Sequence, residues 1–281
     1  MRPGRAATIP GMRSLVPVLL AAVLSISALS CSVQPPLPEP TGTHPYERIA
    51  VIGASGSAGF GIPVNLAEAL DEAITIAHDE PADLASEMTF MDPRNIGKRM
   101  VEEALALDPT IVFAFDFPFW FGYGSNIESE RLSKLEEGLA MLDRIQAPIV
   151  VCGFPDMHFA IGTMLPAELV PEIDTIHALD ARVKEWAAAR PRVVFYDLAA
   201  TIARIEGGET LPLDGEPWPR DGASPFQEDR LHPTEEGMVM ITLHLLDHVE
   251  QSRLGVRGDA FDRDPVPLLE ALERRGDAKQ R

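Results

Sequence analysis

Residues 48–61, RIAVIGASGSAGFG, decide the fold of this chain. The stretch begins with four apolar residues, 49–52, which have the length and composition of a buried parallel strand. It then breaks into Gly, Ala and Ser, and only such small residues let a backbone turn sharply and approach a ligand closely. A helical pattern follows from Pro63. We therefore expect a strand, a tight turn that carries Ser55, and a helix, an arrangement that places ligands at the carboxyl end of the strand.

A second stretch near the far end of the chain complements this serine. Residues 229–233, DRLHP, place an aspartate and a histidine three apart, just before a helical pattern. A nucleophilic serine needs a histidine to accept its proton and an acid to orient that histidine. At this spacing a carboxylate can lie against an imidazole on one turn of the chain. We therefore interpret Ser55, His232 and Asp229 as a candidate catalytic triad.

The two stretches together resemble the first and last sequence blocks of the GDSL or SGNH hydrolases. In that family an Asp-x-x-His block supplies the acid and the base. Ser55 takes the position of the nucleophile and Gly53 that of the leading glycine, whereas Ala54 stands where the family usually has Asp. The resemblance implies a single α/β domain over residues 47–250, with three α/β/α layers and a five-stranded parallel sheet of flavodoxin-like, SGNH hydrolase type.

The resemblance also indicates where an oxyanion hole would find its donors. Gly97 stands where the second block of the family supplies a glycine N–H, and Asn95 is the side-chain alternative; an ordinary helix-entry turn explains the same residues. Asp116 stands where the third block usually has an asparagine whose amide donates, and a carboxylate accepts instead.

Three arrangements would accommodate this aspartate. Asn126 reaches the site from the following loop, or Asp116 is protonated or holds another donor, or the hole relies on the backbone N–H groups of Ser55 and Gly97. We favour the third, with Asp116 orienting a donor or the substrate. Loss of one oxyanion donor typically lowers the rate by about 10²–10³-fold, so slow catalysis would remain.

Further strand patterns alternate with helical patterns along the chain, which predicts a parallel sheet covered on both faces. These strands are expected at residues 88–91, 110–115, 148–152 and 192–196. Residues 117–124, FPFWFGYG, form either the wall of an apolar pocket, which we favour, or core beneath a loop. Residues 207–228 predict a long loop that acts as a lid or rim. Residues 251–281 predict a charged tail, part surface helix and part frayed.

The beginning of the chain has the features of an export signal. In residues 1–31, three arginines precede an uncharged apolar run that ends in Ala-Leu-Ser-Cys. This ending resembles a bacterial lipoprotein signal in which Cys31 becomes the lipidated N-terminus; an ordinary cleaved signal is the alternative. Residues 32–46 hold five prolines and predict an extended tether. We expect an exported protein, held at the cell envelope by a lipid on Cys31, and otherwise periplasmic or secreted.

Composition limits the partners of the protein. The 281 residues, 46% of them hydrophobic, suffice for one large α/β domain. A net charge of −19 is unsuited to nucleic acid, because phosphate contacts need a basic surface. Cys152 is the only cysteine besides Cys31, so no disulfide framework is expected. The histidines lack metal-ligand spacing and the glycines match no nucleotide motif, so we expect neither metal nor cofactor.

The sequence therefore predicts a serine ester hydrolase that works through an acyl-enzyme on a small-molecule, glycan or lipid ester. Short acetyl esters on sugars and longer lipid acyl chains both fit this prediction. The alternative is a catalytically impaired surface lipoprotein of the same fold, which binds a glycan or lipid through residues 117–124. Asp116, at the position of the expected amide, motivates this alternative.

Overall fold

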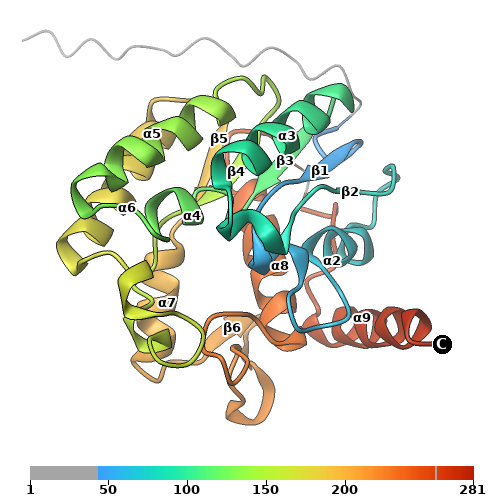
Figure 1. Cartoon of the computed structure of the whole chain (residues 1–281). Coiled ribbons are helices and arrows are strands. Elements are labelled where there is room, and N and C mark those ends of the chain that lie inside the picture. Colours follow the sequence, from blue (N-terminus) through green and yellow to red (C-terminus); the bar gives the residue numbers. More distant parts are fainter. Residues whose placement is uncertain (1–43, 257) are drawn as a thin grey trace, which may run out of the picture. The chain divides into compact units, whose positions relative to one another are not determined.

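The computed structural model describes residues 44–256 and 258–281, and a five-stranded parallel sheet lies at its centre (Figure 1). The strands are β1 (Ile49–Val51), β2 (Ala82–Asp83), β3 (Ile111–Ala114), β4 (Ile149–Cys152) and β5 (Val193–Tyr196). Their order across the sheet is β2-β1-β3-β4-β5, and every neighbouring pair is parallel. The predicted fold class is thus confirmed. The expected export signal, Cys31 and most of the tether lie outside the described residues.

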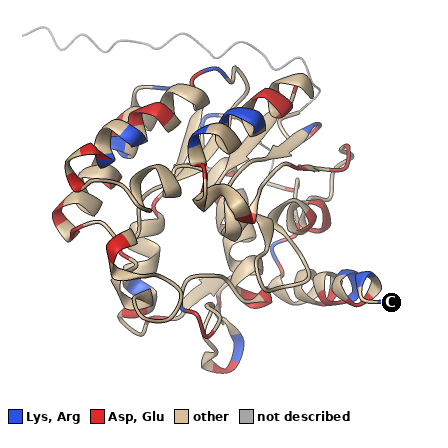
Figure 2. Ribbon diagram, viewed as in Figure 1, with Lys and Arg blue, Asp and Glu red and all other residues tan. Residues whose placement is uncertain are grey.

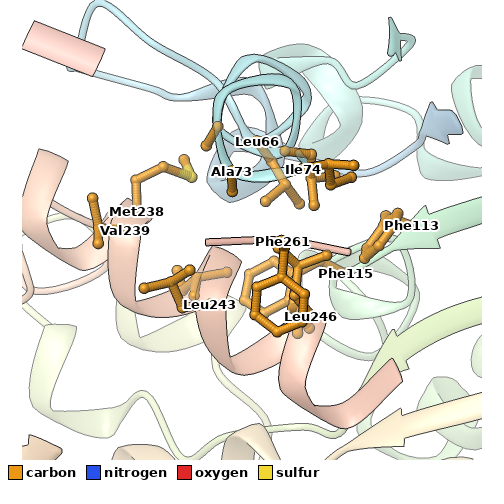
Figure 3. Close-up of a cluster of buried hydrophobic side chains, with 14 of the residues drawn as sticks. Leu66, Ala73, Ile74, Phe113, Phe115, Met238, Val239, Leu243, Leu246 and Phe261 are labelled. Carbon is orange, nitrogen blue, oxygen red and sulfur yellow. The ribbon is translucent and has the colours of Figure 1, made fainter. Parts of the chain in front are cut away.

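Helices cover both faces of the sheet, because successive strand residues point to opposite sides. On one face, Val51 and Phe113 pack with α2 (Leu66–Ala73), α8 (Glu235–Glu250) and α9 (Pro265–Lys279). Figure 3 shows part of this cluster, with Leu66, Phe113 and Leu246 directed toward one another. On the other face, Ala50 and Val112 pack with a second set of helices. These are α3 (Pro93–Ala106), α5 (Arg131–Leu142) and α6 (Ile173–Ala188).

Most charged residues lie on the outside of this arrangement, although Arg131 of α5 is buried. Strands β1, β3, β4 and β5 contain none, and in Figure 2 the acidic and basic residues lie on the outer helices and loops. The fifth strand, β2, ends in the exposed Asp83, so the negative charge lies mainly on the helices and loops and at this edge of the sheet. Within the described part of the chain, no helix combines the length and the apolar character that crossing a membrane requires.

The second strand lies earlier in the chain than expected. Residues 88–91 were expected as a strand, but the structure forms the 3₁₀ helix η1 (Glu87–Phe90) there and places β2 at Ala82–Asp83. The side chain of Ser86 caps η1 by accepting a hydrogen bond from the N–H of Met88. The buried Thr89 hydroxyl then donates to the carbonyl of Gly53 at 3.2 Å. These polar contacts outweigh the strand preference of a short apolar run, and the prediction was wrong.

The end of the chain also differs from the expectation. A surface helix is present as α9, but the expected frayed tail is not, since Leu268, Leu269 and Leu272 are buried. Their spacing of three to four residues places them on one face of the helix, which joins the core formed by α2 and α8. Arg275 and Lys279, on the outer side, pair with Glu68 of α2. The core of the domain therefore includes residues beyond 250.

The expected long loop over residues 207–228 contains a small hairpin. Strands β6 (Leu211–Leu213) and β7 (Glu216–Trp218) pair antiparallel. The Trp218 side chain is buried, and its Nε1 donates to the carbonyl oxygen of Glu236 in α8 at 2.8 Å. This bond ties the hairpin to the beginning of α8, next to His232. A role as a lid or rim stays a prediction.

Candidate active site

Ser55 lies where β1 gives way to a short helix, α1 (Ser55–Ala58). The turn between them depends on Gly53, where a Cβ atom would lie 2.2 Å from Oδ1 of Asp116 and 2.5 Å from Oγ of Ser57. Any other residue would push these groups away. Gly59 ends α1 with a positive φ of 75°, a backbone conformation that favours glycine. The small residues of this stretch thus permit both the sharp turn and the close approach of Asp116.

The structure brings the three predicted triad residues into one hydrogen-bonded line. Oγ of Ser55 is 2.8 Å from Nε2 of His232, and Nδ1 of His232 is 2.7 Å from Oδ2 of Asp229. The imidazole is 2% exposed and lies against the ring of Phe60, with the ring centroids 4.4 Å apart. With Nδ1 protonated toward the carboxylate, Nε2 is free to accept the serine proton. This is the geometry that activation of a serine nucleophile requires.

The Asp229 carboxylate is held by its own segment of chain. Oδ1 accepts hydrogen bonds from the backbone N–H groups of Leu231 at 2.9 Å and His232 at 3.0 Å, while Oδ2 faces the imidazole. Burial by itself would raise the pKa of this carboxyl, but these hydrogen bonds outweigh burial and lower the pKa from its ordinary value. The ionised form, which orients the histidine, is thereby favoured.

This lowered pKa predicts a pH-dependent effect of Asp229→Asn on stability. A carboxyl whose folded pKa lies below its unfolded pKa, about 3.9, stabilises the fold above that value and loses this contribution as pH falls through the folded pKa. We therefore expect the variant to have a lower free energy of unfolding than wild type at pH 7, and a smaller deficit at pH 3, below the unfolded pKa, measured by urea titration. An equal deficit at both pH values would contradict this assignment. Asp277→Asn, at an exposed position of α9, controls for the change in net charge.

Asp116 anchors the serine turn. Its Oδ1 accepts from the N–H of Ala54 at 2.8 Å and from the hydroxyl of Ser57 at 2.6 Å. Its Oδ2 accepts from the N–H groups of Gly56 at 2.8 Å and Ser57 at 3.2 Å. The carboxylate therefore holds several donors of the turn at once, which an asparagine amide at this position would not do, since it has a single acceptor oxygen. This geometry gives a physical reason for an acid at residue 116.

The structure does not bring Gly97 or Asn95 to the serine. Because α3 begins at Pro93 with Asp92 as its cap, Gly97 lies more than one turn inside the helix, where its N–H points along the helix axis. A Cβ atom there would lie 3.1 Å from the ring of Phe117, so this glycine serves packing. Asn95 is exposed and its Nδ2 donates to Oδ2 of Asp92 at 2.7 Å. The expectation that either residue supplies an oxyanion donor was wrong.

Asn126, on the loop that follows Asp116, also has a different role. Its Nδ2 donates to the carbonyl oxygen of Tyr123 at 2.8 Å, within its own loop. Asp116 accepts hydrogen bonds from the N–H groups of Ala54 and Gly56, on both sides of Ser55, whereas the described residues supply no acceptor for the N–H of Ser55 itself. A candidate oxyanion hole in this structure therefore rests on the backbone N–H of Ser55.

Ser55 and His232 open into a pocket of about 730 Å³, part of it open to solvent. The pocket runs past the carboxyl ends of β3, β4 and β5 to the helices α4 (Phe119–Gly122), α7 (Leu198–Glu206) and α8. The lining residues are Ser55, Gly56, Phe115, Asp116, Phe119, Trp120, Pro155, Met157, Tyr196, Leu198, Ile202, Pro225, Phe226, Leu231, His232, Pro233, Gly237, Met240 and Ile241. Most of these side chains are apolar.

Each of the two interpretations of the aromatic segment 117–124 holds for part of the segment. Phe119 and Trp120 line the pocket, as the favoured interpretation predicts. Phe121 and Tyr123 belong to the core beneath, and the Tyr123 hydroxyl donates to the carbonyl of Pro155 at 2.7 Å. Adjacent residues of one short helix point in different directions, so the segment serves as wall and core together.

The sequence did not indicate the contribution of α7 and α8 to the pocket. Leu198 and Ile202 lie four apart on α7, and Met240 and Ile241 lie on α8. This helical spacing of apolar residues is the same as that of ordinary core positions, so no local signal separates them. Among the described residues, no group of His, Cys, Asp and Glu side chains could hold a metal ion.

Solved structures share this fold at low sequence identity. A proposed acylhydrolase from Bacteroides fragilis matches with a TM-score of 0.50 and 15% identity, over 76% of this chain and 91% of that chain. A GDSL-like lipase from Bacteroides thetaiotaomicron gives 0.49 and 13%, over 73% and 89%. An acetylxylan esterase from Geobacillus stearothermophilus gives 0.48 and 15%, over 75% and 97%. No family model and no curated protein matches the sequence. The match to the Bacteroides fragilis protein shows that this chain shares its fold, and a match at this identity shows the fold alone.

Proposed function

We propose that this protein is a serine ester hydrolase in which Ser55 is the nucleophile, His232 the general base and acid, and Asp229 the group that orients the histidine. The observation that carries the proposal is the continuous line of hydrogen bonds, 2.8 Å from serine to histidine and 2.7 Å from histidine to aspartate. Its ends come from opposite parts of the chain and meet in an apolar pocket. A protein that only binds a ligand has no need for a histidine held between a serine and a carboxylate.

The reaction follows from this geometry. Oγ of Ser55 attacks the acyl carbon while its proton passes to Nε2 of His232, and the negative oxygen that forms faces the N–H of Ser55. His232 then donates the proton to the departing alcohol oxygen as the carbon–oxygen bond breaks. Water, deprotonated by His232, then attacks the acyl-enzyme, and His232 returns this proton to Oγ of Ser55 as the acyl carbon–oxygen bond breaks and the acid leaves. Asp229 stabilises the imidazolium at both stages. The candidate oxyanion hole has one backbone donor in place of several. Each missing donor lowers the rate by about 10²–10³-fold.

A second candidate function is a catalytically impaired surface protein that uses the same pocket to bind a glycan or lipid. The lack of side-chain donors at the serine favours this function. Gly97, Asn95 and Asn126 make their contacts away from Ser55. Asp116, which does contact the serine turn, has a carboxylate that accepts hydrogen bonds and does not donate them. The intact line from Ser55 to Asp229 favours hydrolysis. A measurement of serine reactivity separates the two functions, since only hydrolysis needs a nucleophilic hydroxyl.

A fluorophosphonate probe makes this measurement, because it forms a covalent bond with an activated serine. At pH 7.5 we expect wild type to be modified on Ser55, as mapped by mass spectrometry, and His232→Ala to be modified at least about 100-fold more slowly for want of its base. Ser57 and Ser133 in the same digest are internal controls. Wild type that stays unmodified, with its fold intact by circular dichroism, would support the binding function.

Location and partners stay predictions. We propose that the protein is exported and held at the cell envelope through a lipid on Cys31, with the ester substrate as its ligand and no role in nucleic-acid binding. The features in favour are the leader composition of residues 1–31 and the net charge of −19.

A further inference from the structure

The pocket offers few polar groups to a substrate beyond the reacting centre. Among the lining residues, the only charged or titratable side chains besides the Tyr196 phenol are Asp116 and His232. The oxygens of Asp116 are already taken by the serine turn, and Nδ1 of His232 is taken by Asp229. The hydroxyl of Tyr196 lies 3.1 Å from Nδ1 of His244. Nε1 of Trp120 is buried, has no hydrogen-bond partner among the described residues and could donate one hydrogen bond to a ligand. Any further sugar hydroxyls bound in this pocket would lose their hydrogen bonds to water without replacement.

The pocket also extends well beyond the serine. From Ser55 it continues past Phe115 at the end of β3 and Tyr196 at the end of β5, to Ile202 on α7 and Met240 on α8. An acetyl group on Ser55 would occupy only the first part of this space. Water fills an apolar pocket poorly, because each molecule needs several polar partners. An extended apolar group would contact the remaining walls and remove them from water.

We propose that the pocket is an acyl site, and that the substrates are esters of extended apolar acyl groups with several methylenes rather than acetylated sugars. This inference rests on the proposed function of Ser55, and it decides between the two substrate classes that the sequence leaves open. The acyl group is the part that stays bonded to Ser55 while the alcohol leaves and water enters. The apolar walls of the pocket therefore suit the acyl group, and the part of the pocket that is open to solvent suits the alcohol.

The first test is a series of p-nitrophenyl esters from acetate to decanoate at a constant leaving group. Burial of one methylene contributes about 0.8 kcal/mol, which corresponds to about fourfold in kcat/KM. We expect kcat/KM to rise about three- to fourfold per methylene until the pocket is full. A second series varies the alcohol at constant acetate, and its dependence on chain length is expected to be smaller. A profile that is highest for acetate, or a steeper rise with the alcohol, would overturn the acyl assignment.

Variants that fill the pocket test the assignment to these walls. Ile202→Trp and Met240→Trp, on two different helices, should each lower the ratio of octanoate to acetate turnover by at least about tenfold, because the larger ring occupies the space of several methylenes. Ile173→Trp is the matched control, since Ile173 lies on α6, is 42% exposed and does not line the pocket. Its ratio should equal that of wild type. An unchanged ratio in both pocket variants, with their folds intact, would contradict the proposal.

Binding of neutral amides separates this inference from the proposed function. Acetamide, butyramide and octanamide resemble the esters, and calorimetric titration into Ser55→Ala measures their affinity without any reaction. We expect octanamide to bind at least about 100-fold more tightly than acetamide, and Ile202→Trp in the same background to lose this difference. If octanamide binds but no ester is hydrolysed, the acyl site stands and the hydrolase proposal fails. If esters are hydrolysed but the amides bind equally weakly, the hydrolase proposal stands and the acyl site is overturned.

Discussion

Replacement of Ser55 by alanine is expected to lower kcat/KM for p-nitrophenyl butyrate by at least about 10⁴-fold, because no other described hydroxyl lies in hydrogen-bonded line with His232. His232→Ala should lower it by a similar factor, since the serine then has no base. The two residues act as one unit, so the double variant should be no slower than the slower single variant. Initial rates at pH 7.5, corrected for spontaneous hydrolysis, measure all three losses.

A neighbouring serine and a distant serine provide the controls for this result. Ser133→Ala removes an exposed hydroxyl of α5 that donates to the carbonyl of Glu130, and its activity should equal that of wild type. Ser57 is close to the site, but its hydroxyl donates to Asp116 and is not directed to a base. If Ser55→Ala retained activity within tenfold of wild type, the nucleophile would have to be a different group and the triad assignment would be wrong.

Replacement of Asp116 by alanine is expected to lower the free energy of unfolding by about 3 kcal/mol or more. The substitution leaves the N–H groups of Ala54, Gly56 and Ser57 without their acceptor, and hydrogen bonds to a charged group contribute about 1.5–3 kcal/mol each. Some of this loss is recovered because water reaches the half-buried site. Urea titration at pH 7 gives the difference, and an unchanged slope shows that unfolding remains two-state.

Two substitutions that remove less of the same hydrogen-bond network should lower the free energy of unfolding by smaller amounts. Ser57→Ala removes a single hydrogen bond to the carboxylate and should cost about 1.5 kcal/mol. Asp116→Asn keeps one acceptor oxygen but turns an amide donor toward the donors of the turn, so its cost should lie between the other two. If Asp116→Ala proved no more destabilising than Ser57→Ala, then Asp116 would not anchor the serine turn.

Local patterns in the chain predicted much of the fold and the two ends of the site. The alternation of short apolar runs with helical patterns was enough for the parallel sheet, because a strand buried on both faces has a composition of its own. The run of small residues after Ile52 indicated the turn at Ser55, since few backbones can bend so sharply. The spacing of Asp229 and His232 allowed their contact, which is formed within a single turn of chain.

Local patterns did not predict elements that depend on distant partners. Residues 88–91 are apolar enough for a strand, but a bond from Thr89 to Gly53 makes them a 3₁₀ helix. The charged end of the chain becomes α9 because α2 and α8 leave an apolar surface for it to cover. Gly97 resembles a donor before a helix, but α3 begins earlier at Pro93 and takes it inside. In each case a tertiary contact or a helix boundary outweighed the local preference.

By itself, then, the sequence determined the class of fold and the residue types at the reacting centre, because backbone sterics and periodic burial act over a few neighbouring residues. Only the tertiary structure decided which side chains meet. Oγ of Ser55 contacts a histidine that is 177 residues away in the sequence. The carboxylate of Asp116 accepts a hydrogen bond from the N–H of Ala54, which is 62 residues away. The packing of α7 and α8 at the edge of the sheet likewise forms a pocket from residues whose sequence pattern is that of core positions. Such contacts depend on how whole helices and strands pack, and no local pattern encodes that arrangement.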